Sequence, residues 1–253
     1  MGDAPYSEAE VRRLEAVLAQ WNAEPLSFAV HVGDITSGRG PCDDAWLEAR
    51  RAQFARLRLP FVLLPGDNEW TDCHRVGFDP EERLARWRSL FCHPQREIGL
   101  VRQASEYCEH VRWEVGGWVF VGVNVPGSNN NLGRAQASDD EHARRMPAVL
   151  AWLDEALARA QAARGLVVLF QANPFEPAPR GRPDGYAGLR AWLARAAARM
   201  PGRVLVVHGD THQHRDDSPL PGLRRLEVPG SPTVGWLRIG VGPAGARVEL
   251  VVP

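Results

Sequence analysis

The sequence contains no lysine, because all 30 basic side chains among its 253 residues are arginine. This absence excludes a catalytic lysine and a P-loop, whose phosphate-binding motif requires Lys followed by Ser or Thr. The GxSxG turn of Ser-His-Asp hydrolases is missing as well. Any hydrolytic or nucleotide-binding chemistry must therefore use other groups.

Long apolar runs are also absent. No stretch approaches the roughly 20 residues of a membrane-spanning helix, and no basic and apolar leader pattern opens the chain. We therefore expect a cytoplasmic protein without membrane contact. The formal net charge is -1 and the arginines are scattered through every segment, so there is no footprint for nucleic acid. The oligomeric state stays open.

The four cysteines, Cys42, Cys73, Cys92 and Cys108, lie far apart without CxxC spacing. This spacing excludes a zinc knuckle and a thioredoxin-type motif. An even count permits disulfides without requiring them. We expect free thiols at Cys42 and Cys73, with disulfide bonds as the alternative.

The composition is that of a globular protein, with 44% apolar and 24% charged residues. No linker, low-complexity run or fixed repeat divides the chain, so we expect one domain over residues 1–253. A capping box of Ser7 and Glu10 predicts a helix over about 8–22, and an apolar strand over 26–32 follows.

Strand and helix signals then alternate along the chain. Further helices are expected over 43–57, 79–91, 139–162 and 186–200, and further strands over 60–64, 107–115, 118–125, 166–170, 204–207, 223–228, 236–241 and 246–252. Helix-linked strands followed by antiparallel strands predict an α/β fold, a four-layer αββα sandwich of two mixed β-sheets flanked by helices.

Aspartates follow glycine at four places where a strand ends or is expected, namely Asp3, Asp34, Asp67 and Asp210. Because the carboxyl ends of parallel strands meet at one edge, these carboxylates should converge, and their repulsion calls for cations. Oxygen ligands with one or two histidines favour Mg²⁺, Mn²⁺ or iron over zinc. The alternative is ordinary turn chemistry, which explains any single Gly-Asp pair but not its repetition.

Four segments carry a family resemblance: Gly33-Asp34, Gly66-Asp67-Asn68-Glu69, Gln171-Ala172-Asn173-Pro174 and Gly209-Asp210-Thr211-His212. They follow the order GD, GNH[DE], a histidine after a strand, and GHxH, so nearly the whole chain resembles the calcineurin-like metallophosphoesterases. The resemblance implies a hydrolase, a phosphomonoesterase or phosphodiesterase, acting on a small-molecule phosphate ester. It also implies two divalent metal ions, which activate a water and stabilise an in-line displacement.

The resemblance assigns ligands to this centre. Asp34 takes the position of the aspartate that bridges both ions. The other implied ligands are Asp3 and His212 for the first ion, and Asp67, Gln171 and Asp210 for the second.

The chain departs from the family pattern in its histidines. The family has D-x-H where Asp3 stands, and this chain lacks that histidine. Asn68 occupies the place of the histidine that protonates the leaving group, and it has no titratable proton. Gln171 and Asp210 replace metal-binding histidines, which favours harder cations. A degenerate, non-catalytic metal-binding or interaction scaffold is therefore the alternative to an active enzyme.

Other residues are candidates for the missing functions. His74 is the candidate replacement for the proton donor. The alternative, given equal weight, is that His74 has no catalytic role. Ser128 and Asn129 carry groups that can hold phosphate oxygens, although a polar loop also explains them. Arg215 is the candidate phosphate-binding cation.

Family members begin with an apolar strand before the first Gly-Asp, whereas this chain starts at Met1-Gly2-Asp3. We therefore expect the first strand to be missing from the chain. A start further upstream would add it. A signal peptide there would imply a periplasmic or secreted protein and favour a bridge between Cys42 and Cys73.

Overall fold

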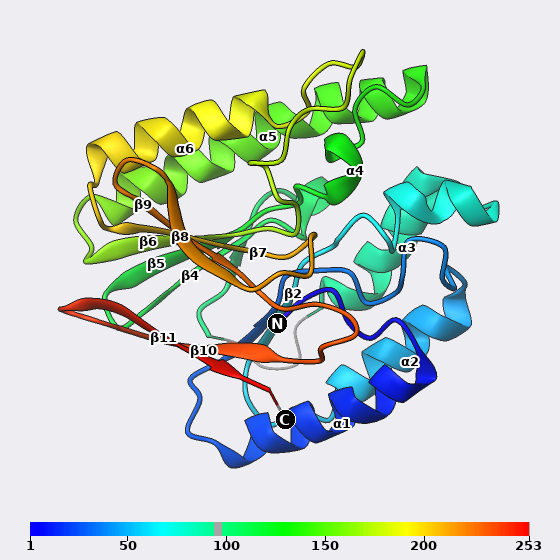
Figure 1. The fold of residues 1–253 in the computed structure, drawn as a ribbon, viewed down its shortest axis with the longest axis horizontal. Helices are drawn as coiled ribbons and strands as arrows, with labels where there is room; N and C mark the ends of the chain where they lie inside the picture. Colours follow the sequence, from blue (N-terminus) through cyan, green and yellow to red (C-terminus); the bar gives the residue numbers. More distant parts are fainter. Residues whose placement is uncertain (94–97, 253) are drawn as a thin grey trace.

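The computed structural model describes residues 1–93 and 98–252 (Figure 1). The helices are α1 (Glu8–Ala23), α2 (Asp44–Phe54), η1 (Thr71–Val76), α3 (Pro80–Phe91), η2 (Ser105–Tyr107), α4 (Gly127–Asn130), α5 (Gln136–Ala160) and α6 (Ala187–Arg199). The strands are β1 (Ala29–His31), β2 (Phe61–Leu63), β3 (Val101–Arg102), β4 (Val111–Val115), β5 (Trp118–Gly122), β6 (Gly165–Leu169), β7 (Val204–His208), β8 (Arg215–Leu220), β9 (Leu223–Glu227), β10 (Trp236–Gly242) and β11 (Gly245–Val251).

Three apolar cores separate four layers, which confirms the predicted αββα sandwich. One core joins α5 and α6 to the large sheet, and another joins α1, α2 and α3 to β1 and β2. The third lies between the two sheet layers. Figure 1 shows α5 and α6 on one side of the molecule and α1 and α2 on the other. None of the helices in the described ranges has the length and apolarity needed to cross a bilayer.

The large sheet has seven strands in the order β3-β4-β5-β6-β7-β9-β8. Its central strands β5, β6 and β7 are parallel and buried throughout. Successive residues face opposite cores, as Val168 packs toward the helices and Leu169 toward the other sheet. This burial on both faces explains why these strands are continuous apolar runs rather than alternating ones.

The antiparallel ending expected for the last third is only partly right. The unpredicted strand β8 forms the edge of the sheet, and β9 lies between β7 and β8. β9 is antiparallel to β8 and pairs in parallel with β7. β8 has the sequence Arg-Asp-Asp-Ser-Pro-Leu, which lacks an apolar pattern. Polar residues and proline are typical of edge strands, so a prediction based on hydrophobicity misses it.

The second layer is discontinuous, consisting of the parallel pair β1-β2 and the hairpin β10-β11. Met1 lies beside β1, donating its ammonium hydrogen to the Val30 carbonyl at 3.0 Å and accepting from the Val32 amide at 2.9 Å. Burial lowers the pKa of the Met1 ammonium to about 5. A largely apolar groove of about 470 Å³ lies between Met1, β1 and β10.

The expectation of free thiols is wrong, since the structure has two disulfides, Cys42–Cys73 and Cys92–Cys108. Cys42 follows the loop of Asp34, and Cys73 lies in η1 just after Asp67. The first disulfide therefore ties together two loops that carry predicted metal ligands.

A left-handed backbone turn follows β5. Ser128, Asn129, Asn130 and Asn131 all have positive φ, between 50° and 64°. Such a run costs roughly 1–2 kcal/mol per residue, so the surroundings must hold it. The guanidinium of Arg145, 1% exposed, does so by donating to the Asn130 side-chain oxygen at 2.8 Å and its carbonyl at 3.1 Å.

Replacing Arg145 by methionine should lower the free energy of unfolding by about 3–5 kcal/mol, because the buried Glu141 carboxylate loses its ion-pair partner. Urea unfolding of the variant measures this. A second variant carrying Arg145→Met and Glu141→Gln should recover part of the loss. A loss below about 1 kcal/mol in the single variant would contradict a holding role for Arg145.

Candidate metal centre and active site

The carboxyl ends of five parallel strand segments meet at one edge of the sandwich. Asp34 follows β1, Asp67 follows β2, Gln171 follows β6 and Asp210 follows β7, while Gly127 and Ser128 follow β5. Asp3 joins them through its amide, which donates to the Gly33 carbonyl at 2.9 Å. The folded chain thus brings together the four aspartates that lie far apart in the sequence.

Asp34 is the centre of this group. Its Oδ1 accepts from the Asn68 amide at 3.0 Å. Its Oδ2 accepts from Asn68 Nδ2 at 2.8 Å, from Gln171 Nε2 at 3.1 Å and from the Tyr6 hydroxyl at 3.1 Å. Glu69 Oε1 accepts from the Asp34 amide at 3.0 Å and from the Gly66 amide at 2.9 Å, and so fixes both turns.

Asp3 and Asp210 lie on the other side of the centre. Asp3 Oδ1 accepts from the Asp210 amide at 3.0 Å, and Asp3 Oδ2 is buried with no partner among the described residues. Asp210 Oδ2 accepts from the Asn173 amide at 2.7 Å. A Cβ on Gly127 would lie 2.7 Å from both Asp67 Oδ1 and Asp210 Oδ1, so these two carboxylates flank Gly127 closely.

Tyr6 is a site residue that sequence reasoning missed. Its hydroxyl lies 3.1 Å from Asp34 Oδ2, 3.2 Å from His212 Nε2 and 3.1 Å from Asn68 Nδ2. The signal was its position, since Tyr6 follows Asp3 in the segment where the family carries D-x-H. The His212 Nδ1 lies 2.8 Å from the Ser231 carbonyl, which can only accept. Nδ1 therefore donates its hydrogen to that carbonyl, and Nε2 is the nitrogen that faces the Tyr6 hydroxyl.

Asp72, also missed, extends the acidic group. The Ser128 hydroxyl lies 2.8 Å from Asp67 Oδ2 and 2.8 Å from Asp72 Oδ1. Asp72 is 3% exposed and pairs with Arg75 at 2.6 Å. Asp72 lies in a 3-10 turn after the Asp67 motif, and such a short turn has no hydrophobic periodicity by which the sequence could have indicated Asp72.

The backbone at the ligand positions is left-handed. Asp3, Asp34, Asp210 and His212 have φ of 52°, 62°, 85° and 60°. Gly66 and Gly209 are required by close approach, because a Cβ on Gly66 would collide with the Asp34 carboxylate and one on Gly209 with that of Asp3. Residues held in this uncommon conformation cluster at functional sites, where the surroundings compensate the strain.

Burial and mutual repulsion shift the ionisation of these carboxyl groups. Burial, with repulsion from neighbouring carboxylates, raises the pKa of Asp67, Glu69 and Asp210 to about 7 each. The same causes raise the pKa values of Asp3 and Asp34 well above the ordinary aspartate value. Such a group is stabilised by protonation or by a cation.

The donor set fits a hard divalent cation in its chemistry. Carboxylate oxygens predominate, His212 Nδ1 is hydrogen-bonded to a carbonyl as in metal-ligating histidines, and Asp3 Oδ2 has no partner among the residues that the structure describes. Within the described ranges, however, no three of these carboxylate and imidazole groups lie within 4.8 Å of one another, so binding requires them to move inward. Gln171 Oε1 accepts from the Gly127 amide at 2.5 Å, and a ligand role for Gln171 requires its amide to turn over.

The remaining predicted residues take different positions. His74 is exposed, and its Nδ1 lies 2.7 Å from the Thr71 carbonyl. Asn129 donates to the Leu132 and Pro183 carbonyls at 2.8 and 3.0 Å, so its side chain holds the left-handed turn. Arg215 pairs at 2.6 Å with Glu227, which is fully buried. Their catalytic and substrate-binding roles stay predictions.

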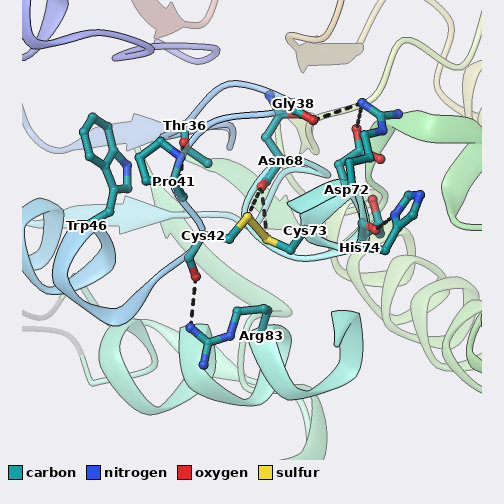
Figure 2. The surroundings of a disulfide bond; sticks show 12 residues. Thr36, Gly38, Pro41, Cys42, Trp46, Asn68, Asp72, Cys73, His74 and Arg83 are labelled. Carbon is teal, nitrogen blue, oxygen red and sulfur yellow. Dashed lines mark hydrogen bonds and ion pairs between the residues drawn. A yellow bond between two sulfur atoms is a disulfide. The ribbon is translucent and has the colours of Figure 1, made fainter. Parts of the chain in front are cut away.

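The Cys42–Cys73 disulfide lies directly beneath Asn68, as Figure 2 shows. Both sulfur atoms lie 3.4 Å from the Asn68 carbonyl oxygen. The Cys42 carbonyl accepts from Arg83 of α3 at 2.9 Å. The disulfide thus anchors the loops of Asp34 and Asp67 to the helical layer.

Comparison with solved structures finds phosphatases of the same fold. A dimetal phosphatase from Danio rerio matches with a TM-score of 0.58 and 13% identity over 91% of this chain and 86% of that chain. A purple acid phosphatase from yellow lupin (Lupinus luteus) seeds matches with a TM-score of 0.51 and 13% identity. That match covers 94% of this chain and 40% of the lupin chain.

No family model and no curated protein sequence matches the chain. The predicted resemblance to metallophosphoesterases is nevertheless confirmed at the level of the fold, because both phosphatases share its layered architecture over most of this chain.

Without metal, the contribution of Asp210 to stability should fall as pH rises from about 4 to about 8. The folded pKa of Asp210 is about 7, above its ordinary value of 3.8, so its contribution is present at low pH and lost as pH rises through 7. Urea unfolding in EDTA measures the slope. Asp210→Asn should remove this falling contribution and so shift the slope in the positive direction, whereas Asp217→Asn on edge strand β8 removes a lowered pKa and should shift it the opposite way. Mn²⁺ should stabilise more at pH 8 than at pH 5. An unchanged slope in Asp210→Asn would contradict this origin.

Removing the Cys42–Cys73 disulfide by paired serine substitutions should lower stability by about 3–4 kcal/mol and weaken Mn²⁺ binding, because the loops of Asp34 and Asp67 lose their link. Paired serines at Cys92 and Cys108 are the matched control, expected to cost about 3 kcal/mol without changing Mn²⁺ affinity. Calorimetric titration of Mn²⁺ compares them. Equal affinities in both variants would show that the disulfide does not shape the centre.

Proposed function

We propose that this protein is a metal-dependent phosphoric ester hydrolase. The observation that supports it best is the convergence of Asp3, Asp34, Asp67 and Asp210 at one sheet edge, with His212 Nε2 3.2 Å from the Tyr6 hydroxyl that contacts Asp34. The carboxyl edge of an α/β sheet is where such folds bind ligands. The solved structure of the same fold that is a dimetal phosphatase supports the proposal of metal-dependent phosphate ester hydrolysis.

Asp3, Asp34, Asp67, Asp210 and His212 would hold divalent metal ions, up to two, of which Mn²⁺, Mg²⁺ or iron suit the oxygen donors better than zinc. Bound ions would supply Lewis-acid polarisation of the phosphoryl oxygens and neutralise the carboxylates. The chain itself orients the donors. Glu69 and Ser231 fix Asp34 and His212 through hydrogen bonds of 3.0 and 2.8 Å.

The proton for the leaving group is the main chemical question. Asn68 donates its amide hydrogens to Asp34 and Tyr6, and it has no proton to transfer. We therefore propose substrates whose leaving group departs without protonation, such as aryl phosphate esters. His74, which is exposed and contacts the Thr71 carbonyl through Nδ1, is the candidate donor for other substrates.

A non-catalytic scaffold is the second candidate, and the hydrogen bonds of Asp34 favour it. Asn68, Gln171 and Tyr6 all donate to Asp34 Oδ2, which satisfies this oxygen without a cation. In that case the acidic centre would serve stability or weak metal binding alone.

The protein loaded with Mn²⁺ should hydrolyse an aryl phosphate. Asp34→Asn should lower kcat/KM at least about 100-fold, because Asp34 lies at the centre of the donor group. Steady-state kinetics after loading with Mn²⁺, Mg²⁺ or Fe²⁺ measure this. Asp216→Asn on β8 is the control and should retain full activity, and thermal unfolding verifies that both variants fold. His74→Ala tests the donor separately.

Metal-independent turnover, or turnover unchanged in Asp34→Asn, would refute this centre as the catalyst. Absence of turnover with every metal, in protein that binds Mn²⁺ and is folded, would favour the scaffold.

A further inference from the structure

Arg75 lies at the rim of the acidic centre and connects three of its loops. It belongs to η1, just after the Asp67 motif, and its Nη1 lies 2.6 Å from Asp72 Oδ2. Nη1 also donates to the Gly38 carbonyl at 3.3 Å, and Nη2 donates to the Ser128 hydroxyl at 3.2 Å. The side chain is nevertheless 37% exposed.

The guanidinium is close to the ligand carboxylates. Ser128, which accepts from Arg75, lies 2.8 Å from Asp67 Oδ2, so a single hydroxyl separates Arg75 from a predicted metal ligand. A Cβ on Gly38 would lie 2.9 Å from Arg75 Nη1 and 3.0 Å from Asn68 Oδ1. Figure 2 shows Gly38, Asn68 and Asp72 around the same pair of loops.

Arg75 has N–H groups that are not used by its contacts in the described ranges. A guanidinium carries five N–H groups, and the three contacts above leave the Nε hydrogen and one Nη2 hydrogen without a partner in the described ranges. Planar guanidinium forks match phosphate oxygens in geometry and charge. Arg215, the cation predicted from the sequence, is instead committed to the buried carboxylate of Glu227.

We propose that Arg75 binds the phosphoryl group of the substrate and favours phosphate monoesters over diesters. This inference rests on the proposed function, and it adds the substrate class and the residue that selects it. A monoester dianion carries one more negative charge than a diester, so it gains more from a guanidinium at the rim. Asp72 holds Arg75 in place while its free N–H groups contact the substrate.

The test is calorimetric titration of inorganic phosphate into Mn²⁺-loaded protein. Arg75→Gln should weaken phosphate binding by about tenfold to hundredfold, as expected for loss of charged hydrogen bonds. Arg224→Gln is the matched control, because Arg224 is also 37% exposed and pairs with an aspartate, Asp216, on the edge hairpin. It should bind phosphate as the wild type does.

A second variant tests whether Arg75 binds phosphate directly or only neutralises the charge of Asp72. Arg75→Gln combined with Asp72→Asn removes both charges, so the carboxylate no longer needs a partner. Phosphate binding should stay weak in this variant if Arg75 contacts the ligand. Recovery to the wild-type affinity, or an unchanged affinity in Arg75→Gln alone, overturns the inference.

Turnover provides an independent measurement. In Arg75→Gln, the ratio of kcat/KM for an aryl monoester to that for an aryl diester should fall by about tenfold. An unchanged ratio overturns the monoester preference. Phosphate binding that depends on Arg75 in a protein without turnover refutes the proposed hydrolase but supports Arg75 as the anion contact, whereas no phosphate binding by the Mn²⁺-loaded wild type overturns that contact.

Discussion

Repulsion among buried carboxylates governs the architecture of this protein at the sheet edge where the aspartates converge. Asp3, Asp34, Asp67, Glu69 and Asp210 lie within one region from which water is largely excluded, and their pKa values are raised by burial and by one another. Folding cannot bring them together as five bare charges. Protons, hydrogen-bond donors or cations must compensate. The surrounding residues provide donors to most of these oxygens, but no residue in the described part of the chain donates to Asp3 Oδ2.

Several contacts fix the backbone around these carboxylates. Parallel strands bring the loops to one edge, glycines allow the loops to touch, and the Cys42–Cys73 disulfide ties two of them together. Arg145 and Asn129 hold the left-handed turn that presents Ser128 to Asp67. The side chains would still have to move inward to hold a cation.

Neutral hydrogen-bond donors surround the central carboxylate. Asn68, Gln171 and Tyr6 all donate to Asp34 Oδ2. Burial raises the pKa of Asp72, and the positive charges of Arg75 and Arg134 offset part of that rise. Under our proposal, an anionic ligand would lie between the acidic centre and the Arg75 guanidinium.

Much of this protein follows from the sequence alone. The apolar periodicity predicted the long helices and buried strands, and four repeated Gly-Asp turns located Asp3, Asp34, Asp67 and Asp210, because both are local signals read along the chain. Strand β8 and the parallel placement of β9 escaped prediction, since an edge strand needs no apolar pattern.

Tertiary structure decided the rest. The role of Tyr6 depends on His212, which lies far along the chain, and the environment of Asp72 depends on Ser128 and Arg75. Which amide hydrogens face Asp34 follows from the hydrogen bond that Gly127 gives to Gln171. Contacts of this kind join segments through space, and no periodicity or spacing within one segment encodes them.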